Sequence, residues 1–239
     1  MSLAKHVSIM GATGAVGTEL LKILEERKFP IASLRLLASA KSAGKKLTFR
    51  GEQIPVETLG HDSFKGTEIV LASAGGSLSR EFAPSAVKAG AVVVDNTSYF
   101  RMHDNVPLVI PEINPEDIKK HQGIIANPNC STIILLMPLA PIHKAFGVKR
   151  LVVSTYQAAS GAGQTAMNEL EDESRAFLEG KEFKRTVIPH PYAFNLFPHN
   201  SPMTESGYCE EEIKMVKESR KILKDPGLLV TATCVRVPV

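Results

Sequence analysis

Cys130 is the residue of this chain whose position most directly suggests chemistry. It lies in the polar stretch ANPNCST (126–132), directly before the apolar run IILLMPLAPI (133–142). This pattern predicts that a helix begins near Asn129 and Cys130, and a helix N-terminus stabilises a thiolate. Backbone N–H groups there, with the Asn129 side chain, could also bind an oxyanion. Because a free cysteine is more often a small buried hydrophobe, packing is the alternative to a nucleophile.

The cysteines as a set suggest neither a disulfide framework nor a metal site. The chain contains three of them, Cys130, Cys209 and Cys234, and has no C-x-x-C motif. An odd number without a close pair argues against a disulfide scaffold and against a thiolate zinc site. No spacing of His, Cys and Asp suggests another kind of metal site, so we expect no metal.

Residues 11–17, GATGAVG, have the spacing of a dinucleotide-binding turn. They follow the apolar stretch 6–10 and open a segment, 15–27, with apolar residues at helical spacing. In such a turn the first glycine permits the tight bend, the second lets backbone approach a pyrophosphate, and the third allows close helix packing. The helix N-terminus then faces the phosphates. A turn needed only for packing is the alternative. The predicted cofactor contacts are Gly11, Thr13, Gly14, Ala15, Val16 and Gly17.

The end of the second predicted strand indicates which dinucleotide would bind. An NAD site usually places an acidic residue there to bond the ribose 2′-hydroxyl. This chain instead has ASAKSAGKK (38–46), which contains no acid. Ser39, Lys41 and Ser42 could hold a 2′-phosphate, so the prediction is NADP. A solvated basic turn is the alternative.

The first half of the chain alternates short apolar runs with helical patterns. Residues 6–10, 34–39, 68–73 and 91–95 are predicted strands, and residues 15–27 and 79–90 are predicted helices. Short apolar strands separated by helices indicate a parallel sheet that is buried on both faces. We therefore predict an α/β protein whose N-terminal domain, residues 1–131, is a doubly wound Rossmann-type domain.

A second, α+β domain is predicted for residues 132–239. Its longer elements are strands at 150–160 and 228–239 and helices at 165–180 and 210–224, with an aromatic, proline-rich loop at 190–202. Because the last predicted strand runs to the final residue, we expect this domain to be incomplete at its C-terminus.

The composition narrows the classes of function. The formal net charge is +3, and basic residues are interspersed with acidic ones, so no nucleic-acid partner is indicated. No apolar run approaches the ~20 residues that span a bilayer, so no membrane partner is expected. We expect a cytoplasmic protein.

Several motifs in order resemble those of the aspartate-semialdehyde dehydrogenase family. They are GATGAVG, ASAKSAGK, DNTSYFRM, PEIN, NPNCST, YQAASGAG, EEEIK and VRVP, and they extend over the whole chain. The resemblance implies an NADP-dependent enzyme that reversibly converts L-aspartyl 4-phosphate to L-aspartate 4-semialdehyde through a cysteine thioester. It also implies a role in lysine, threonine and methionine biosynthesis, inorganic phosphate as a ligand, and a homodimer built through a catalytic and dimerisation domain.

The resemblance also assigns roles to individual residues. Cys130 matches the nucleophile, and Gln157 matches the residue that orients the substrate. Arg236 matches the arginine that binds the substrate α-carboxylate, which suits its planar fork. Taken singly, each of the matched cations Arg101, Lys214 and Arg236 could be a surface ion-pair partner. Gln157 could be a core amide. The nicotinamide end of the cofactor site matches Ser73, Ser160 and Gly161. The substrate and phosphate site matches Arg101, Asn129, Glu211 and Lys214.

One family residue has no match in this chain. The general base of the family is a histidine a few residues beyond the closing RVPV, and neither His143 nor His190 lies at its place. His199 is the best substitute within the chain, although we expect it to bond within its own loop. Two alternatives stay open: an enzyme like N-acetyl-glutamyl-phosphate reductase, and a catalytically silent homologue that binds the cofactor.

Overall fold

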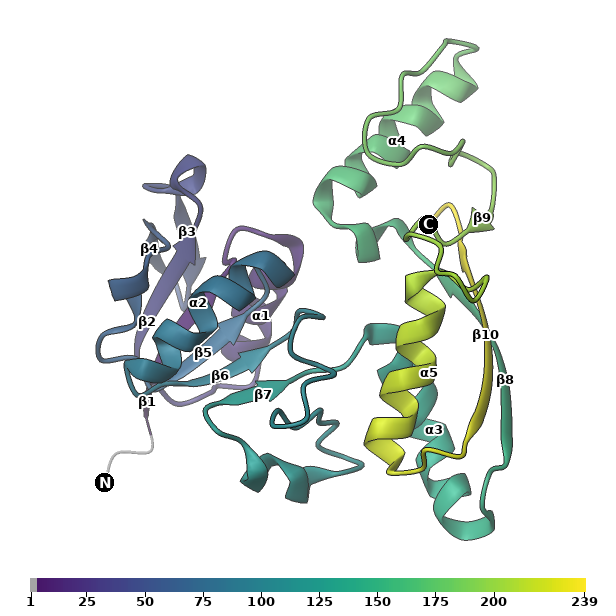
Figure 1. Ribbon diagram of the computed structural model, residues 1–239. Coiled ribbons are helices and arrows are strands. Elements are labelled where there is room, and N and C mark those ends of the chain that lie inside the picture. Colours follow the sequence, from purple (N-terminus) through teal and green to yellow (C-terminus); the bar gives the residue numbers. More distant parts are fainter. Residues whose placement is uncertain (1–3) are drawn as a thin grey trace. The chain divides into compact units, whose positions relative to one another are not determined.

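The structure is a computed structural model that describes residues 4–239 (Figure 1). The chain divides into two compact units, one up to Asn129 and one from Cys130 onward. The division falls two residues before the boundary predicted at residue 131.

The first unit is built on a seven-stranded sheet with the strand order β3-β4-β2-β1-β5-β6-β7. All neighbouring strands are parallel except the pair β3 and β4, which is antiparallel. The strands are β1 (Lys5–Met10), β2 (Ile31–Ala38), β3 (Lys46–Phe49), β4 (Glu52–Thr58), β5 (Ile69–Ala72), β6 (Val92–Asp95) and β7 (Ile124–Ala126). This sheet confirms the predicted α/β fold with a Rossmann-type first domain.

Two helices connect neighbouring strands of this sheet, and the two connections lead toward opposite edges of the sheet. The helix α1 (Ala15–Glu26) leads from β1 to β2, and α2 (Gly76–Lys88) leads from β5 to β6. Because β2 and β5 flank β1 on opposite sides, right-handed crossovers place the two helices on opposite faces of the sheet. The order reverses at β1, and ligands bind outside the carboxyl ends of the strands at such a point.

Four of these strands and both helices lie where the sequence predicts them. The hairpin β3–β4 and the short strand β7 were not predicted. The unit also contains three short 3-10 helices, η1 (Ala40–Ser42), η2 (His61–Phe64) and η3 (Pro115–Lys120). Side chains of β1, β2, β5 and β6 form the core of the sheet, and its fully buried members include Ile9, Leu36, Leu37, Val70 and Val93.

The second unit contains a smaller sheet with the order β8-β10-β9. Its long strands β8 and β10 are parallel, and β9 pairs with β10 in the antiparallel direction. In chain order the elements are α3 (Cys130–Phe146), β8 (Arg150–Gln157), η4 (Ala159–Ala162), α4 (Gln164–Leu178), β9 (Phe197–Pro198), α5 (Glu210–Leu223) and β10 (Leu229–Arg236). No helix in the described part of the chain is long and apolar enough to cross a membrane.

Two strands of this unit end earlier than the sequence suggests. The strand predicted at 150–160 ends at Gln157, because the next residues turn into η4, where Gly163 has a φ of 91°. The strand predicted at 228–239 ends at Arg236, two residues before Pro238, which has no N–H to donate to a ladder. In both cases the ladder stops at a side chain for which the family resemblance predicts a role in the site.

One face of the β8–β10 pair packs against helices, and the opposite face is open. Val153 of β8 and Ala232 and Cys234 of β10 form a core with Met215 of α5. Figure 1 shows α3 and α5 on this side of the two strands. Residues of β8 alternate between exposed and half-buried, and Val152 and Tyr156 are large exposed side chains of the open face.

A buried carboxylate on α4 fixes the long loop between α4 and β9. The Glu169 side chain is only 8% exposed. It accepts hydrogen bonds from the backbone N–H groups of Thr186, Val187 and Ile188 at 2.6–2.8 Å, and from the Thr186 hydroxyl at 2.8 Å. Burial alone would raise the pKa of Glu169, but these bonds outweigh it and hold the pKa below its ordinary value.

Replacing this carboxylate should destabilise the second unit. In Glu169→Gln, an amide NH₂ would face backbone donors, and we expect the free energy of unfolding to fall by about 1–3 kcal/mol at pH 7. A carboxyl whose pKa is lower in the folded than in the unfolded protein stabilises the fold at pH values above its unfolded pKa. That contribution disappears as pH falls through the folded pKa. The difference in the free energy of unfolding between wild type and variant, measured by urea titration, should therefore shrink below about pH 4.

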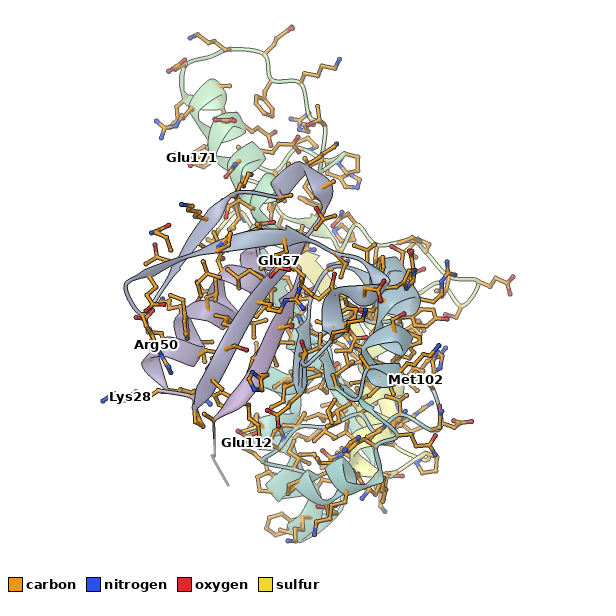
Figure 2. All side chains as sticks on the ribbon, turned by 90° about the vertical axis from the view of Figure 1, so that its left-hand side faces the viewer. Lys28, Arg50, Glu57, Met102, Glu112 and Glu171 are labelled. Atoms are coloured by element: carbon orange, nitrogen blue, oxygen red, sulfur yellow. The ribbon has the colours of Figure 1, made fainter. Side chains whose placement is uncertain are left out.

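The matched control is Glu171→Gln on the same helix. Glu171 is exposed (Figure 2) and makes an ion pair with Arg175 one turn further on. Because exposed pairs contribute little, this variant should unfold like the wild type. Equal losses in the two variants would contradict the role of Glu169.

Candidate active site

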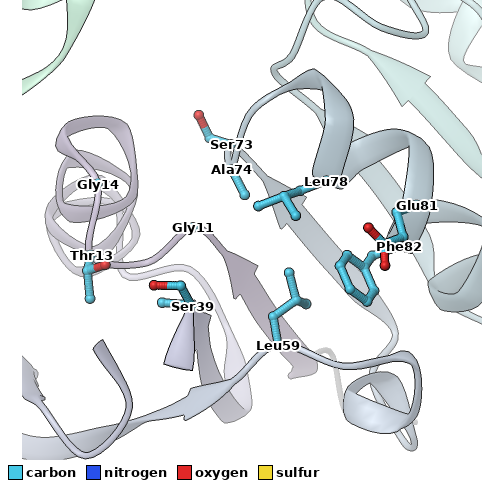
Figure 3. Close-up of a pocket in the computed structure, with 11 residues that line it drawn as sticks. Gly11, Thr13, Gly14, Ser39, Leu59, Ser73, Ala74, Leu78, Glu81 and Phe82 are labelled. Atoms are coloured by element: carbon cyan, nitrogen blue, oxygen red, sulfur yellow. The ribbon is translucent and has the colours of Figure 1, made fainter. Parts of the chain in front are cut away.

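A cavity of about 520 Å³ lies at the carboxyl ends of the central strands of the first unit (Figure 3). The turn between β1 and α1 forms one wall with Gly11, Thr13 and Gly14, and Ser73 follows β5. The remaining lining residues are Ala38, Ser39, Leu59, Ala74, Leu78, Glu81 and Phe82. The apolar side chains and the glycine turn together suit a ligand with a flat apolar group and phosphates.

Two of the three glycines are required by close contacts. Gly11 has a φ of 92°, and a Cβ there would lie 2.6 Å from the carbonyl oxygen of Ser73. A Cβ at Gly17 would lie 2.2 Å from the carbonyl oxygen of Gly11. Gly14 has an ordinary φ of −80° and is the N-cap residue directly before α1. The turn therefore needs Gly11 and Gly17 for its own shape, whereas access for a pyrophosphate at Gly14 stays a prediction.

The residues predicted to hold a 2′-phosphate surround the end of β2. Ser39 lines the cavity, and Ser42 in η1 accepts a hydrogen bond from the Thr13 hydroxyl at 3.3 Å. Lys41 lies between them, is exposed and is not among the lining residues. The one carboxylate among the lining residues belongs to Glu81, on the side of the cavity away from Ser39 (Figure 3). Ala15 and Val16 are the first residues of α1.

Arg101 is held near the carboxyl ends of β6 and β7. Its side chain is 7% exposed, its Nε donates to the Asn127 carbonyl, and its Nη2 donates to the Asn96 carbonyl, both at 2.9 Å. Asn129, two residues after Asn127, is also buried. The sequence reasoning missed Asn96 and Asn127. Their position directly after strands of a parallel sheet is the signal that could have found them.

In the second unit, Cys130 is the first residue of α3 and is exposed. The next side chain, Ser131, accepts a hydrogen bond from Gln157 Nε2 at 2.9 Å. The same nitrogen donates to Glu211 Oε1 at 3.1 Å. Lys214 Nζ donates to the other carboxylate oxygen of Glu211 at 3.1 Å. The structure therefore brings Gln157, Glu211 and Lys214 into one hydrogen-bonded chain that ends beside the predicted nucleophile.

Arg236 is a buried cation that faces Gln157 across the β8–β10 ladder. It is 4% exposed and is paired in register with Gln157. Nη1 donates to the Ala158 carbonyl at 2.9 Å, and Nε donates to the Asn200 side-chain oxygen at 3.3 Å. Within the described residues no carboxylate lies at salt-bridge distance from it. Because a buried charge is costly unless it is paired, an anionic ligand is the expected partner.

His199 is bonded within its own loop, as expected. Its Nδ1 accepts a hydrogen bond from the Ser201 N–H at 3.1 Å, so the neutral ring carries its proton on Nε2. Burial, and then the charge of Arg236, lower the pKa of His199 to about 4. His143 likewise accepts from the Val148 N–H at 3.1 Å, and His190 stacks near Phe197.

Several predicted site residues lie in different units. Ser160 and Gly161 belong to η4 of the second unit, whereas the Gly11 cavity belongs to the first. Their predicted contact with the nicotinamide therefore stays a prediction, and so does a common phosphate site for Arg101, Asn129 and Lys214. Gly161 lies near Arg236, since a Cβ at this position would be 3.0 Å from Nη1. In the described part of the chain, no group of His, Cys, Asp and Glu could hold a metal ion.

Comparison with known proteins gives consistent matches over both units. Residues 6–121 match the family "Semialdehyde dehydrogenase, NAD binding domain", and residues 139–239 match "Semialdehyde dehydrogenase, dimerisation domain". The aspartate-semialdehyde dehydrogenase of Synechocystis sp. is 58% identical over 98% of this chain and 69% of its own length. That of Aquifex aeolicus is 54% identical over 98% of this chain and 70% of its own length.

Solved structures agree with these relatives. The crystal structure of aspartate semialdehyde dehydrogenase II complexed with ASA from Vibrio cholerae has a TM-score of 0.97 and 45% identity. The match covers 99% of this chain and 71% of that one. The enzyme with NADP from Candida albicans has a TM-score of 0.70 and 26% identity over 99% of this chain and 68% of that one.

Cys130 should be the first thiol to react with an alkylating agent. It is exposed, whereas Cys209 and Cys234 are buried, and burial raises the pKa of the Cys234 thiol to about 11. Limited iodoacetamide treatment at neutral pH, followed by peptide mapping, should find the label on Cys130 ahead of the other two. Initial labelling of Cys209 with activity retained would contradict the assignment of Cys130.

Proposed function

The chain belongs to the aspartate-semialdehyde dehydrogenase family, and from that premise we propose the role of each site residue in the family's reaction. The protein is an oxidoreductase of amino-acid biosynthesis that interconverts L-aspartyl 4-phosphate and L-aspartate 4-semialdehyde. Neither alternative considered from the sequence is favoured, since the curated relatives at 46–58% identity are aspartate-semialdehyde dehydrogenases.

Cys130 is the nucleophile of this proposal, and its exposure at the start of α3 is the observation that supports it. Its thiolate attacks the acyl carbon of aspartyl phosphate, the C–O bond to phosphate breaks, and a thioester forms as inorganic phosphate leaves. When bound, the reduced cofactor supplies a hydride to the thioester carbon, which leaves the oxyanion of a hemithioacetal on Cys130. As this oxyanion reforms the carbonyl, the C–S bond breaks, and the aldehyde and the Cys130 thiolate are released with no net proton transfer. Phosphate is the attacking group in the reverse direction.

Gln157 and Glu211 position the groups around the thiol. Gln157 is held by Ser131 and Glu211, so its amide has a defined orientation beside α3. Glu211 is buried and holds the Lys214 ammonium at 3.1 Å. In this proposal Lys214 binds the phosphate group together with Arg101 and Asn129, and Glu211 sets its direction. A preorganised cation near the leaving group lowers the barrier to acyl transfer.

Arg236 binds the α-carboxylate of the substrate. Burial and the absence of a carboxylate partner within the described residues support this role. The bonds to Ala158 and Asn200 use neutral acceptors, so they orient the guanidinium without neutralising it. Gly161 leaves space over Nη1 that a side chain would fill.

The chain binds a nicotinamide dinucleotide through its first domain, and we propose that the cofactor is NADP. Residues of the cavity fit this group: the glycine turn faces it, and the segment after β2 has hydroxyl groups and Lys41 but no acid. A 2′-phosphate suits such a segment. We assign residues 1–131 to this cofactor-binding domain and residues 132–239 to catalysis and dimerisation.

The open face of the β8–β10 sheet is the proposed surface for a homodimer. Val152 and Tyr156 are exposed there although they lie in the middle and at the end of a regular strand. Their β10 partners in register, Thr231 and Val235, continue the same face. Exposed apolar faces of this kind mark association surfaces.

Because the buried cysteines are free thiols, we place the enzyme in the cytoplasm.

Kinetics of Arg236→Lys test the proposed function. The full-length protein should oxidise L-aspartate 4-semialdehyde with NADP⁺ and inorganic phosphate. Because lysine cannot form the bidentate pair, KM for the semialdehyde should rise and kcat/KM should fall by about 1–3 kcal/mol in transition-state terms. The exposed Arg175→Lys is the matched control and should behave as wild type. Wild-type kinetics of Arg236→Lys would contradict the carboxylate role, and no wild-type turnover would contradict the function.

Lys41→Glu should change the preference between cofactors. A carboxylate beside Ser39 and Ser42 would repel a 2′-phosphate and could bond a 2′-hydroxyl. Titration should show that the Kd of NADPH rises at least about tenfold, while that of NADH changes little. Lys45→Glu, a few residues further on, serves as the control for the general loss of a positive charge. Equal changes for both cofactors would contradict the 2′-phosphate role.

A further inference from the structure

Three neighbouring strands of the first unit end in polar side chains that contact one another. Ser73 follows β5, Asn96 follows β6, and Asn127 follows β7. Their backbones are aligned by ladder bonds, since the Asn96 N–H donates to the Ala72 carbonyl at 2.8 Å and the Asn127 N–H to the Asp95 carbonyl at 2.8 Å. The three side chains therefore lie side by side along one edge of the sheet.

The Asn96 amide uses both of its ends in this row. Its Oδ1 accepts from Asn127 Nδ2 at 2.8 Å, and its Nδ2 donates to the Ser73 hydroxyl at 3.2 Å. Ser73 lines the cofactor cavity. Ser73 and Asn127 are thus linked through a single side chain, that of Asn96.

The backbone carbonyls of the same two asparagines hold Arg101. Nη2 of Arg101 donates to the Asn96 carbonyl and Nε to the Asn127 carbonyl, both at 2.9 Å. The guanidinium is planar and rigid, so two acceptors that follow different strands constrain its plane. Loss of the bond between the two asparagine side chains would therefore remove one constraint on the spacing of the two carbonyls that hold Arg101.

We propose that Asn96 is a positioning residue that couples the cofactor site at Ser73 to the anion-binding arginine, Arg101. Cofactor bound against Ser73 favours one arrangement of the row from Ser73 to Asn127, and that arrangement directs Arg101 toward inorganic phosphate. By linkage, phosphate then strengthens binding of the cofactor by the same factor. This inference rests on the proposed phosphate role of Arg101.

The coupling is measured as a ratio of two dissociation constants. Calorimetric titration gives the Kd of NADP⁺ for the full-length protein, with and without saturating inorganic phosphate. In the wild type, phosphate should lower this Kd by at least about fivefold. In Asn96→Ala the ratio should fall to within about twofold of one. The exposed Asn105→Ala, in the loop after Arg101, is the matched control and should keep the wild-type ratio.

A second variant keeps the test decisive if Asn96→Ala does not fold. Ser73→Ala removes the hydroxyl that Asn96 contacts and leaves the Asn96–Asn127 bond in place. Its affinity for NADP⁺ should fall, but the ratio with and without phosphate should also approach one. Structural damage alone would raise both dissociation constants and leave their ratio at the wild-type value.

Three results would overturn the inference: a ratio of one in the wild type, an undiminished ratio in Asn96→Ala, or an undiminished ratio in Ser73→Ala. The proposed role of Arg101 fails separately, if Arg101→Ala leaves the KM for inorganic phosphate unchanged. If that KM rises and Asn96→Ala keeps the wild-type ratio, only the coupling is wrong.

Discussion

Parallel pairing of strands is the constraint on which both units depend. In a parallel pair the carboxyl ends meet at one edge, so side chains that end or directly follow each strand are brought together. In the first unit this edge collects the glycine turn, Ser39, Ser73 and the two asparagines. In the second unit the β8–β10 register sets Gln157 beside Arg236. Residues far apart in sequence become neighbours for the same geometric reason.

The chain also buries several charged side chains, and these differ in whether their partners satisfy the charge. Glu169 is satisfied by four donors of a single loop, so it stabilises the fold. Arg236 has only neutral acceptors, and Glu211 shares its carboxylate between an amide and Lys214. A fully satisfied charge rigidifies the protein, whereas a buried cation without an anion has binding energy left for a ligand. We propose that this contrast distinguishes charges that stabilise the fold from charges that bind a ligand.

Much of the fold could be predicted from the sequence, because apolar strands such as 6–10 and 91–95 carry a strong local pattern. The hairpin β3–β4 could not, since KLTF and EQIPVET are short, polar and interrupted by Pro55. For the site, the GATGAVG turn and Cys130 are visible because their chemistry is local. Asn96, Asn127 and the anchoring role of Glu169 depend on contacts between distant segments, and no local pattern distinguishes them from ordinary polar residues.

The central claim is that Cys130 carries the acyl group, and trapping that group tests it most directly. The full-length protein is incubated with L-aspartyl 4-phosphate without reduced cofactor, then quenched in acid, digested and analysed by mass spectrometry. The account predicts one aspartyl group on the peptide that contains Cys130, released by hydroxylamine as thioesters are, and absent in Cys130→Ser. An aspartyl group on Cys209 or Cys234, or an unmodified Cys130 in a protein that turns over, would contradict it.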